Sequence, residues 1–273
     1  MPEGHSIRYF ADAHEHCFQG LPVEASSPQG RFTEGAAAID GRVLLGTTTH
    51  GKHLFLHFGE VDEIVHIHLG LYGWFSAMSK KDKTAEDSSL QPRPSTRLRL
   101  ENSYYVSDLI GPTKCEYITT ERLQEICARL GPDPLHEEAD PTQFYDKVLS
   151  SKKTIGQLLM DQSVIAGVGN VYRAELLFLA QQNPMTPGNE VDAQTLVKIW
   201  DAAAVLMQDG ATDGMIRTVP KYNLTEEEKQ RGRYTQYSNV YKRQTNPCRV
   251  CGTSVSVADL AGRKLYWCTE CQK

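Results

Sequence analysis

The chain has 273 residues, of which 40% are hydrophobic and 23% charged, values that are ordinary for a globular protein. No apolar run approaches the roughly 20 residues of a membrane-spanning helix, and the N-terminus lacks a signal-peptide pattern, so we expect a cytoplasmic protein without membrane association. The formal net charge is −5, but residues 229–273 carry nine Lys and Arg against two acidic residues, so this segment holds +7 and the first 228 residues hold −12. A polyanion would therefore bind near the C-terminus.

The chain begins Met1-Pro2-Glu3-Gly4. Because initiator methionine is removed efficiently before proline, we expect the mature chain to start with the secondary amine of Pro2, beside the Glu3 carboxylate. An α-amino group titrates near pH 8, so a useful fraction is a neutral nucleophile in the cell. Such an amine attacks carbonyl-like carbons, and a secondary amine gives a charged iminium. An ordinary chain start remains the alternative, since proline is common in the first turn of a helix.

The spacing of apolar residues predicts a helix over residues 4–19, which Gly20 would end. From residue 21 to residue 118, short β-like runs alternate with turns and predict a sandwich or barrel. These runs are residues 43–45, 54–56, 64–69, 97–100 and 104–106. Residues 79–95 are polar and contain prolines, which indicates a loop.

Helical periodicity returns at residues 121–126, and Gly131-Pro132-Asp133-Pro134 then breaks the chain. Residues 141–208 are predicted to be mainly helical and residues 209–236 to form a loop. We therefore predict three domains, which span residues 1–130, 131–240 and 241–273.

Four cysteines in the last 26 residues follow the pattern C-x2-C, sixteen residues, C-x2-C: Cys248, Cys251, Cys268 and Cys271. This spacing is typical of a zinc ribbon that binds one structural ion. An iron–sulfur cluster or a redox pair is disfavoured, because nothing nearby resembles a redox partner. The metal would fold a segment that has no core of its own and hold Arg263 on a rigid hairpin. Such a ribbon could bind protein, but its basic surroundings favour nucleic acid.

Two further motifs have a structural and a functional interpretation. Gly167-Val168-Gly169-Asn170 precedes a predicted helix, where Asn170 would be the N-cap and the free backbone N–H groups could bind a phosphate. An ordinary capped turn is the alternative. Lys52 stands at the entry of an alternating strand, where a lone lysine is usually a solvated edge charge.

Four histidines in the predicted strands raise the question of a second metal site: His53, His57, His66 and His68. His66 and His68 alternate with Val65 and Ile67, as ordinary half-buried sheet residues do. We therefore expect sheet histidines and no second metal.

The combination of a Pro-Glu terminus, a strand lysine, a Gly-x-Gly-Asn turn and a basic zinc ribbon resembles the formamidopyrimidine-DNA glycosylase/endonuclease VIII family. The resemblance extends from Pro2 to Gln272. It implies an α+β multidomain fold, with an N-terminal β-sandwich and leading helix, then a helix-two-turn-helix domain that ends in a zinc finger. It implies a monomeric, nucleoid-associated enzyme that acts on damaged double-stranded DNA, with single-stranded DNA as a second candidate substrate.

By this resemblance, Pro2 is the nucleophile, Glu3 the general acid and Lys52 the active-site lysine of a β-hairpin. The implied activity is that of a DNA glycosylase and AP lyase, which removes an oxidised base and cleaves the strand by β- and δ-elimination. Zinc would play no part in this chemistry.

The same resemblance assigns DNA-binding roles outside the catalytic centre. Asn170 and Arg263 would bind phosphates, and Glu175 would support the active site. Leu71 and Tyr72 would fill the gap left by the flipped nucleotide, as in the endonuclease VIII branch and most closely its actinobacterial type, which favours oxidised pyrimidines.

One departure from the family pattern is His5-Ser6, where the family usually has Pro-Glu, so lesion recognition by the usual glutamate is in doubt. Two other functions stay open at this point. A catalytically inactive protein of the same fold would bind damaged duplex without covalent trapping, and a protein-binding zinc-ribbon adaptor would show no salt-dependent affinity for DNA.

Overall fold

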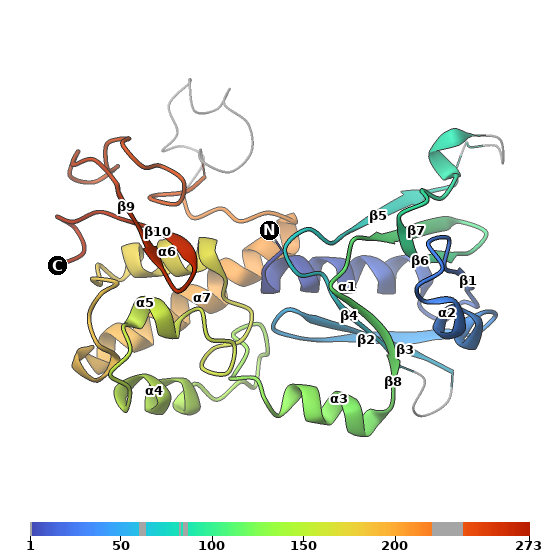
Figure 1. Cartoon of the computed structure of the whole chain (residues 1–273), viewed down its shortest axis with the longest axis horizontal. Helices are drawn as coiled ribbons and strands as arrows, with labels where there is room; N and C mark the ends of the chain where they lie inside the picture. The colour runs from blue at the N-terminus through green and yellow to red at the C-terminus, as the bar shows by residue number, and fades with distance from the viewer. Residues whose placement is uncertain (1, 60–63, 82, 84–86, 220–236) are drawn as a thin grey trace. The chain divides into compact units, whose positions relative to one another are not determined.

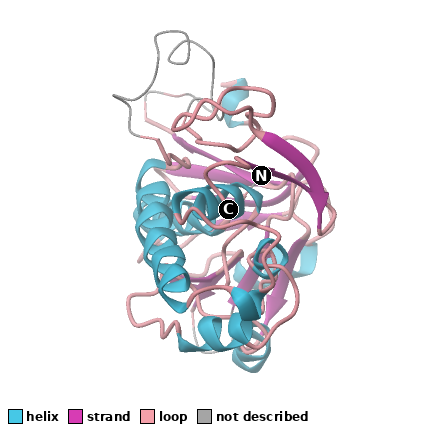
Figure 2. Ribbon diagram, turned by 90° about the vertical axis from the view of Figure 1, so that its left-hand side faces the viewer, coloured by secondary structure: helices cyan, strands magenta, loops and turns pink. Residues whose placement is uncertain are grey.

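A computed structural model describes residues 2–59, 64–81, 83, 87–219 and 237–273. The chain divides into two compact units. Unit 1 comprises Met1–Pro2 and Ser6–Ala128, and unit 2 comprises Glu3–His5 and Arg129–Lys273. Strands form most of the regular structure of unit 1 and helices most of that of unit 2 (Figure 1). Figure 2 distinguishes the helices, in cyan, from the strands, in magenta.

Unit 1 contains two four-stranded antiparallel sheets, with strand orders β1-β6-β7-β5 and β2-β3-β4-β8. The strands are β1 Glu24–Ser26, β2 Leu44–His50, β3 His53–Phe58, β4 Ile64–His68, β5 Trp74–Ser79, β6 Thr96–Glu101, β7 Tyr105–Ile110 and β8 Lys114–Ile118. Helix α1 (Gly4–Phe18) shares one core with both sheets, for example through Ile7, Leu56 and Leu100. The predicted β-sandwich with its leading helix is confirmed.

Strand β3 is buried on both faces, which explains its almost continuous apolar sequence. Leu54, Leu56 and Phe58 point into the sandwich core. Phe55 packs on the other side, in a cluster with Ile126 of α3 (Thr120–Cys127). Helix α3 therefore covers the outer face of the sheet that contains β3.

Four short elements of unit 1 were missing from the sequence prediction: β1, β5, β8 and helix α2 (Thr33–Ile39). The three strands lie at sheet edges and bury few side chains, so their alternation is weak; β5 buries only Phe75. Within the predicted loop 79–95, residues Ser88–Leu90 form the 3-10 helix η1, and residues 82 and 84–86 lie outside the described part of the chain.

Unit 2 is mainly helical and ends in a β-hairpin. Its elements are α4 Thr142–Leu149, α5 Ile155–Leu158, α6 Asn170–Leu179, η2 Gly188–Glu190, α7 Ala193–Asp213, β9 Ser256–Leu260 and β10 Arg263–Trp267. Helix α6 is buried from Asn170 to Phe178, as expected for a helix in the middle of a core. The helical region and the cysteine-bearing hairpin agree with the predicted fold class.

The predicted loop 209–236 begins too early. Helix α7 continues to Asp213, because Ala211 is still buried, and Gly214 then ends the helix in the left-handed conformation. Residues 220–236 lie outside the described residues. No helix in the described part of the chain is long and apolar enough to cross a membrane.

Candidate active site

Glu3 lies at the N-terminus of α6, within unit 2. Its side chain is fully buried. Its Oε2 accepts hydrogen bonds from the backbone N–H groups of Gly169 (2.9 Å) and Tyr172 (3.3 Å), and its Oε1 accepts one from Val171 (2.8 Å). The first N–H groups of a helix have no partner within the helix, and the helix dipole makes this end positive. The start of α6 therefore stabilises the Glu3 carboxylate.

The prediction of a backbone phosphate site at this helix start is wrong, because the Glu3 carboxylate occupies these N–H groups. Asn170 is also not the N-cap: Gly169 holds that position, and no side chain forms a capping hydrogen bond there. The anion comes from a residue that is separated from Gly169 by 166 positions in the chain, so no local pattern could have revealed it.

Two glycines allow this close approach. A Cβ atom on Gly169 would lie only 2.5 Å from Cδ of Glu3. Gly167 adopts a φ of +83°, which favours glycine, and its carbonyl accepts the N–H of Gly4 at 2.9 Å. The Gly-Val-Gly segment therefore fixes Glu3 and Gly4 against the start of α6.

Asn170 binds strand β10 beside the turn that joins it to β9. Its Nδ2 donates to the Lys264 carbonyl at 2.9 Å, and its Oδ1 accepts from the fully buried Arg173 at 2.5 Å. Arg173 also donates to the carbonyls of Leu260 and Lys264, each at 3.2 Å. These bonds fix the hairpin on which Arg263 stands half-buried, so Asn170 and Arg263 belong to one connected group.

Glu175 is fully buried and binds a segment that follows the undescribed residues. Its carboxylate accepts from the backbone N–H groups of Asn239 (2.7 Å), Val240 (2.9 Å) and Tyr241 (2.8 Å), and from the Thr218 hydroxyl. Burial and the negative charge of Glu3 raise the pKa of Tyr241, and a hydrogen bond with Asn170 acts in the opposite direction. Glu175 thus fixes the backbone of Tyr241, whose side chain forms a hydrogen bond with Asn170.

Sequence reasoning missed three members of this group: Arg173, Thr218 and Tyr241. Arg173 carried a signal, because it stands three residues after Asn170 on the same helix, where side chains meet. Burial, followed by the repulsion of Arg263, lowers its pKa to about 10, so it stays protonated at neutral pH. For Thr218 and Tyr241 the sequence contains no comparable signal.

The other predicted site residues belong to unit 1. Pro2 precedes Glu3 directly, and Met1, whose removal was predicted, lies outside the described residues. Lys52 stands in the tight turn of the β2–β3 hairpin, after Gly51 with its φ of +58°. Leu71 and Tyr72 lie in the turn between β4 and β5, with 38% and 85% of their surfaces exposed. They are not buried sheet core, so their side chains are accessible to a ligand.

The sheet histidines of unit 1 form a hydrogen-bonded chain. Nδ1 of His53 lies 2.8 Å from Nε2 of His66, and Nδ1 of His66 lies 2.8 Å from a carboxylate oxygen of Glu116. Burial, followed by the charges of His68 and the other nearby histidines and lysine, lowers the pKa of His53 to about 3. Burial also lowers the pKa values of His66 and His68. At neutral pH these imidazoles are therefore neutral.

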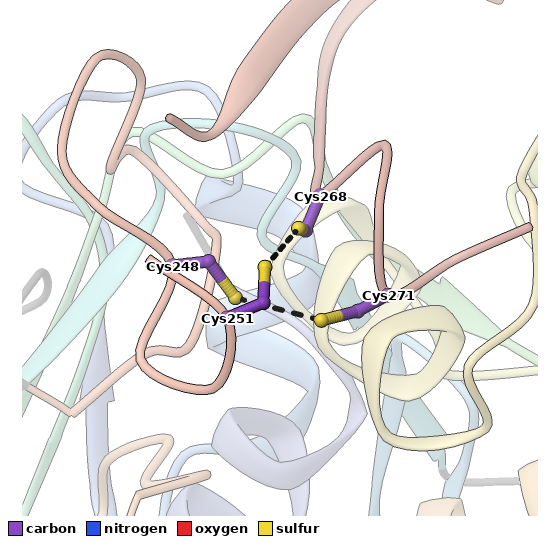
Figure 3. Close-up of side chains that lie close together, drawn as sticks. All are labelled: Cys248, Cys251, Cys268 and Cys271. Atoms are coloured by element: carbon purple, nitrogen blue, oxygen red, sulfur yellow. Dashed lines mark hydrogen bonds between the residues drawn. The ribbon is translucent and has the colours of Figure 1, made fainter. Parts of the chain in front are cut away.

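The four cysteines of the predicted ribbon converge (Figure 3). Their sulfur atoms all lie within 4.8 Å of one another, with Cys248–Cys271 and Cys251–Cys268 separations of 3.8 and 3.4 Å. A tetrahedral ion with Zn–S bonds of about 2.3 Å places its sulfurs about 3.8 Å apart. Hydrogen bonds from Thr253 lower the pKa of Cys251, whereas burial raises the pKa values of Cys268 and Cys271. The four residues can bind a metal ion.

Comparisons with known proteins cover most of the chain. A family model described as the formamidopyrimidine-DNA glycosylase N-terminal domain matches residues 1–108, and one described as the H2TH domain of that enzyme matches residues 130–219. The chain is 42% identical to Endonuclease 8 1 of Mycobacterium tuberculosis over 274 residues, with 100% of both proteins covered. It is 28% identical to the formamidopyrimidine-DNA glycosylase of Prochlorococcus marinus, over 92% of this chain and 91% of that protein.

Solved structures with the same fold include complexes with DNA. Lactococcus lactis Fpg bound to DNA containing N7-benzyl-Fapy-dG matches with a TM-score of 0.78 and 22% identity, over 100% of both chains. A complex of that protein with abasic-site DNA matches with a TM-score of 0.79 and 21% identity, over 99% of both chains. The architecture of this chain is thus shared from end to end.

Proposed function

The chain belongs to the formamidopyrimidine-DNA glycosylase/endonuclease VIII family of DNA glycosylases with AP lyase activity, and we propose that it removes oxidised bases, preferring pyrimidines, through a Schiff base on Pro2. The 42% identity to Endonuclease 8 1 over the full length supports the endonuclease VIII branch. The substrate is damaged double-stranded DNA, which the enzyme binds mainly through phosphates and from which it flips the target nucleotide.

The reaction starts at the amine of Pro2. The nitrogen attacks C1′ of the deoxyribose, and the bond from C1′ to the base breaks with its electron pair on the base, which takes up the proton that the Pro2 nitrogen loses. The sugar ring then opens as its oxygen takes a proton from Glu3. The product is an iminium between Pro2 and C1′, which acidifies the hydrogen on C2′. Loss of that proton breaks the C3′–O bond, and a second elimination breaks the C5′–O bond.

Glu3 supplies the proton to the ring oxygen in this proposal. The observation that carries it is the fully buried carboxylate, which accepts three backbone hydrogen bonds at the start of α6. These donors hold the carboxyl group in one position beside the nucleophile, so a proton that it carries is delivered at one place. The contacts also fix the residue that directly follows the nucleophile.

The remaining residues bind DNA or stabilise the site. Lys52 balances phosphate charge and assists proton transfer. Asn170 and Arg263 bind phosphates, and the connection through Arg173 supports a joint role. Leu71 and Tyr72 fill the gap left by the extruded nucleotide, and Glu175 stabilises the site through Tyr241.

Zinc is the ion we propose for the cysteine group, because four thiolates at these separations match its tetrahedral geometry. Four protein ligands leave no open position, so the ion would stabilise the hairpin that carries Arg263 and take no part in base removal.

A panel of labelled oligonucleotides tests this function. It should contain an oxidised pyrimidine, a formamidopyrimidine, 8-oxoguanine and an abasic site, each in duplex and single-stranded form. We expect fastest excision of the oxidised pyrimidine in duplex and product ends typical of β,δ-elimination. Binding without excision would indicate an inactive damage-binding protein, and absence of salt-dependent DNA binding would indicate a protein-binding adaptor.

A further inference from the structure

An exposed tryptophan lies beside the Leu71–Tyr72 turn in unit 1. Trp74 is the first residue of β5, two positions after Tyr72, and 37% of its surface is exposed. The guanidinium carbon of Arg93 lies 5.3 Å from the centroid of the Trp74 ring. An arginine at this distance from an indole is held by a cation–π interaction.

The sheet places this pair at the same end as the Leu71–Tyr72 turn. Trp74 pairs with Ile110, and Ile110 pairs with Thr96 at the start of β6. The carbonyl of Arg93 accepts the N–H of Thr96 at 2.9 Å. Pro92 and Pro94 flank Arg93 and restrict its backbone. The backbone of Arg93 is therefore fixed at this end of the sheet, and its guanidinium lies by the Trp74 ring.

The charge of Arg93 is available to a ligand. Among the residues that the structure describes, no carboxylate lies within ion-pair distance of Arg93. Its exposed side chain contacts the Trp74 ring, and its charge acts on Asp108 only at longer range. Arg99 of β6 differs in both respects, since it is buried and bonded to Asp108 and Glu101. An exposed guanidinium beside a ring keeps N–H edges accessible, and these edges fit a phosphate.

We propose that Arg93, held on the Trp74 ring, binds a backbone phosphate of duplex DNA next to the gap that Leu71 and Tyr72 fill. This inference rests on the proposed function, because it needs a duplex whose nucleotide has been extruded. A phosphate contact adjacent to the gap would keep the distorted strand in register while Leu71 and Tyr72 take the place of the extruded base in the base stack.

The competing explanation is structural: the pair could fasten the loop 91–95 to the sheet without touching DNA. The two explanations differ in the expected salt dependence. A lost phosphate contact lowers the slope of log K against log salt by about 0.9, whereas a loosened loop lowers thermal stability and leaves that slope unchanged.

The test measures binding of wild type, Arg93→Ala, Arg93→Lys and Trp74→Leu to a duplex with an uncleavable abasic-site analogue, at several salt concentrations. We expect Arg93→Ala to bind roughly tenfold more weakly with a slope lower by about 0.9, and Arg93→Lys to keep most of the slope. Trp74→Leu should keep the slope and lose part of the affinity. Arg122→Ala is the control, because Arg122 is an arginine of unit 1 whose side chain is 41% exposed and pairs with Glu125.

A scan with single neutral methylphosphonate linkages locates the contact. One linkage near the gap should weaken wild type and leave Arg93→Ala unaffected. An unchanged slope for Arg93→Ala, or equal responses of Arg93→Ala and wild type to every linkage, would overturn the inference. If wild type forms borohydride-trapped adducts while Arg93→Ala behaves like wild type in both assays, only this inference fails. If wild type forms no adducts, the proposed function fails.

Discussion

Replacement of Glu3 by glutamine separates the structural role of this residue from its catalytic role. A glutamine has the same shape, but only one of its two terminal atoms accepts hydrogen bonds. In the better orientation its oxygen keeps the bonds from Gly169 and Tyr172, and its NH2 group then faces the N–H of Val171. One hydrogen bond is lost, and two change from charged to neutral acceptors.

The magnitude follows from these three bonds. A hydrogen bond to a charged group contributes about 1.5–3 kcal/mol and a neutral one about 1 kcal/mol, so Glu3→Gln should lower the free energy of unfolding by about 2.5–7 kcal/mol. For a unit of this size, that corresponds to a fall in Tm of about 5–28 °C. Loss of the proton donor should reduce base excision by about 10²–10⁴-fold, with a smaller loss on a preformed abasic site, where no base has to leave.

The assay is single-turnover excision well below the variant's melting temperature, with Tm and lesion-DNA affinity measured on the same preparations. Glu3→Asp is the matched control, because it keeps a carboxylic acid and should retain more excision than Glu3→Gln. Gly169→Ala tests the same contact from the other side, since its Cβ would displace the Glu3 carboxylate and should reduce excision with Glu3 intact. Excision at the wild-type rate by folded Glu3→Gln would remove Glu3 from the mechanism.

Three further outcomes are expected. Leu71→Ala/Tyr72→Ala should melt near the wild-type temperature and lose about one to two orders of magnitude on duplex lesions but much less on single strands; a uniform loss with a lowered Tm would exclude the gap-filling role. Removal of a bound metal by a chelator should weaken DNA binding more than Arg263→Ala does. An unchanged affinity for DNA after metal loss would show that the hairpin does not contribute to DNA binding. The pKa of His53 is lowered from 6.5 to about 3 in the folded chain. As the pH falls, the imidazole is therefore protonated in the unfolded chain before it is protonated in the folded chain. The free energy of unfolding should fall by up to about 4 kcal/mol as the pH drops from about 6.5 to about 3. Denaturant titrations of His53→Phe should show a weaker fall, and an identical pH dependence would refute this explanation.

The sequence predicted those parts of the molecule whose signal is local. The cysteine spacing led to a convergent thiol group, and the three-to-four spacing of apolar residues located α1 from Gly4 to Phe18. Edge strands such as β5 were missed because they bury too few side chains for alternation to be visible. The periodicity of apolar residues in a sequence reflects which side chains a segment buries. A segment that buries few side chains therefore shows no clear periodicity and is difficult to predict.

The candidate site needed the three-dimensional structure for a different reason. Glu3 and the start of α6 are more than 160 positions apart in the sequence. Their contact shows that the N–H groups after the Gly-Val-Gly turn bind the Glu3 carboxylate, where the sequence had suggested a phosphate. Glu175 was singled out by resemblance alone, and only the structure connects it, through the backbone of Asn239, Val240 and Tyr241, to Asn170. Long-range pairs of this kind carry no periodic signal.

The identity of the nucleophile is the central claim, and mass spectrometry of the borohydride-trapped complex tests it directly. Protein that has lost Met1 should be trapped on abasic-site DNA, and digestion should place the reduced adduct on the N-terminal nitrogen of Pro2. A chain that keeps an N-terminal extension has an amide at that nitrogen and should form no adduct, although it still binds the same DNA. An adduct on a lysine, or equal trapping of the extended chain, would contradict the account.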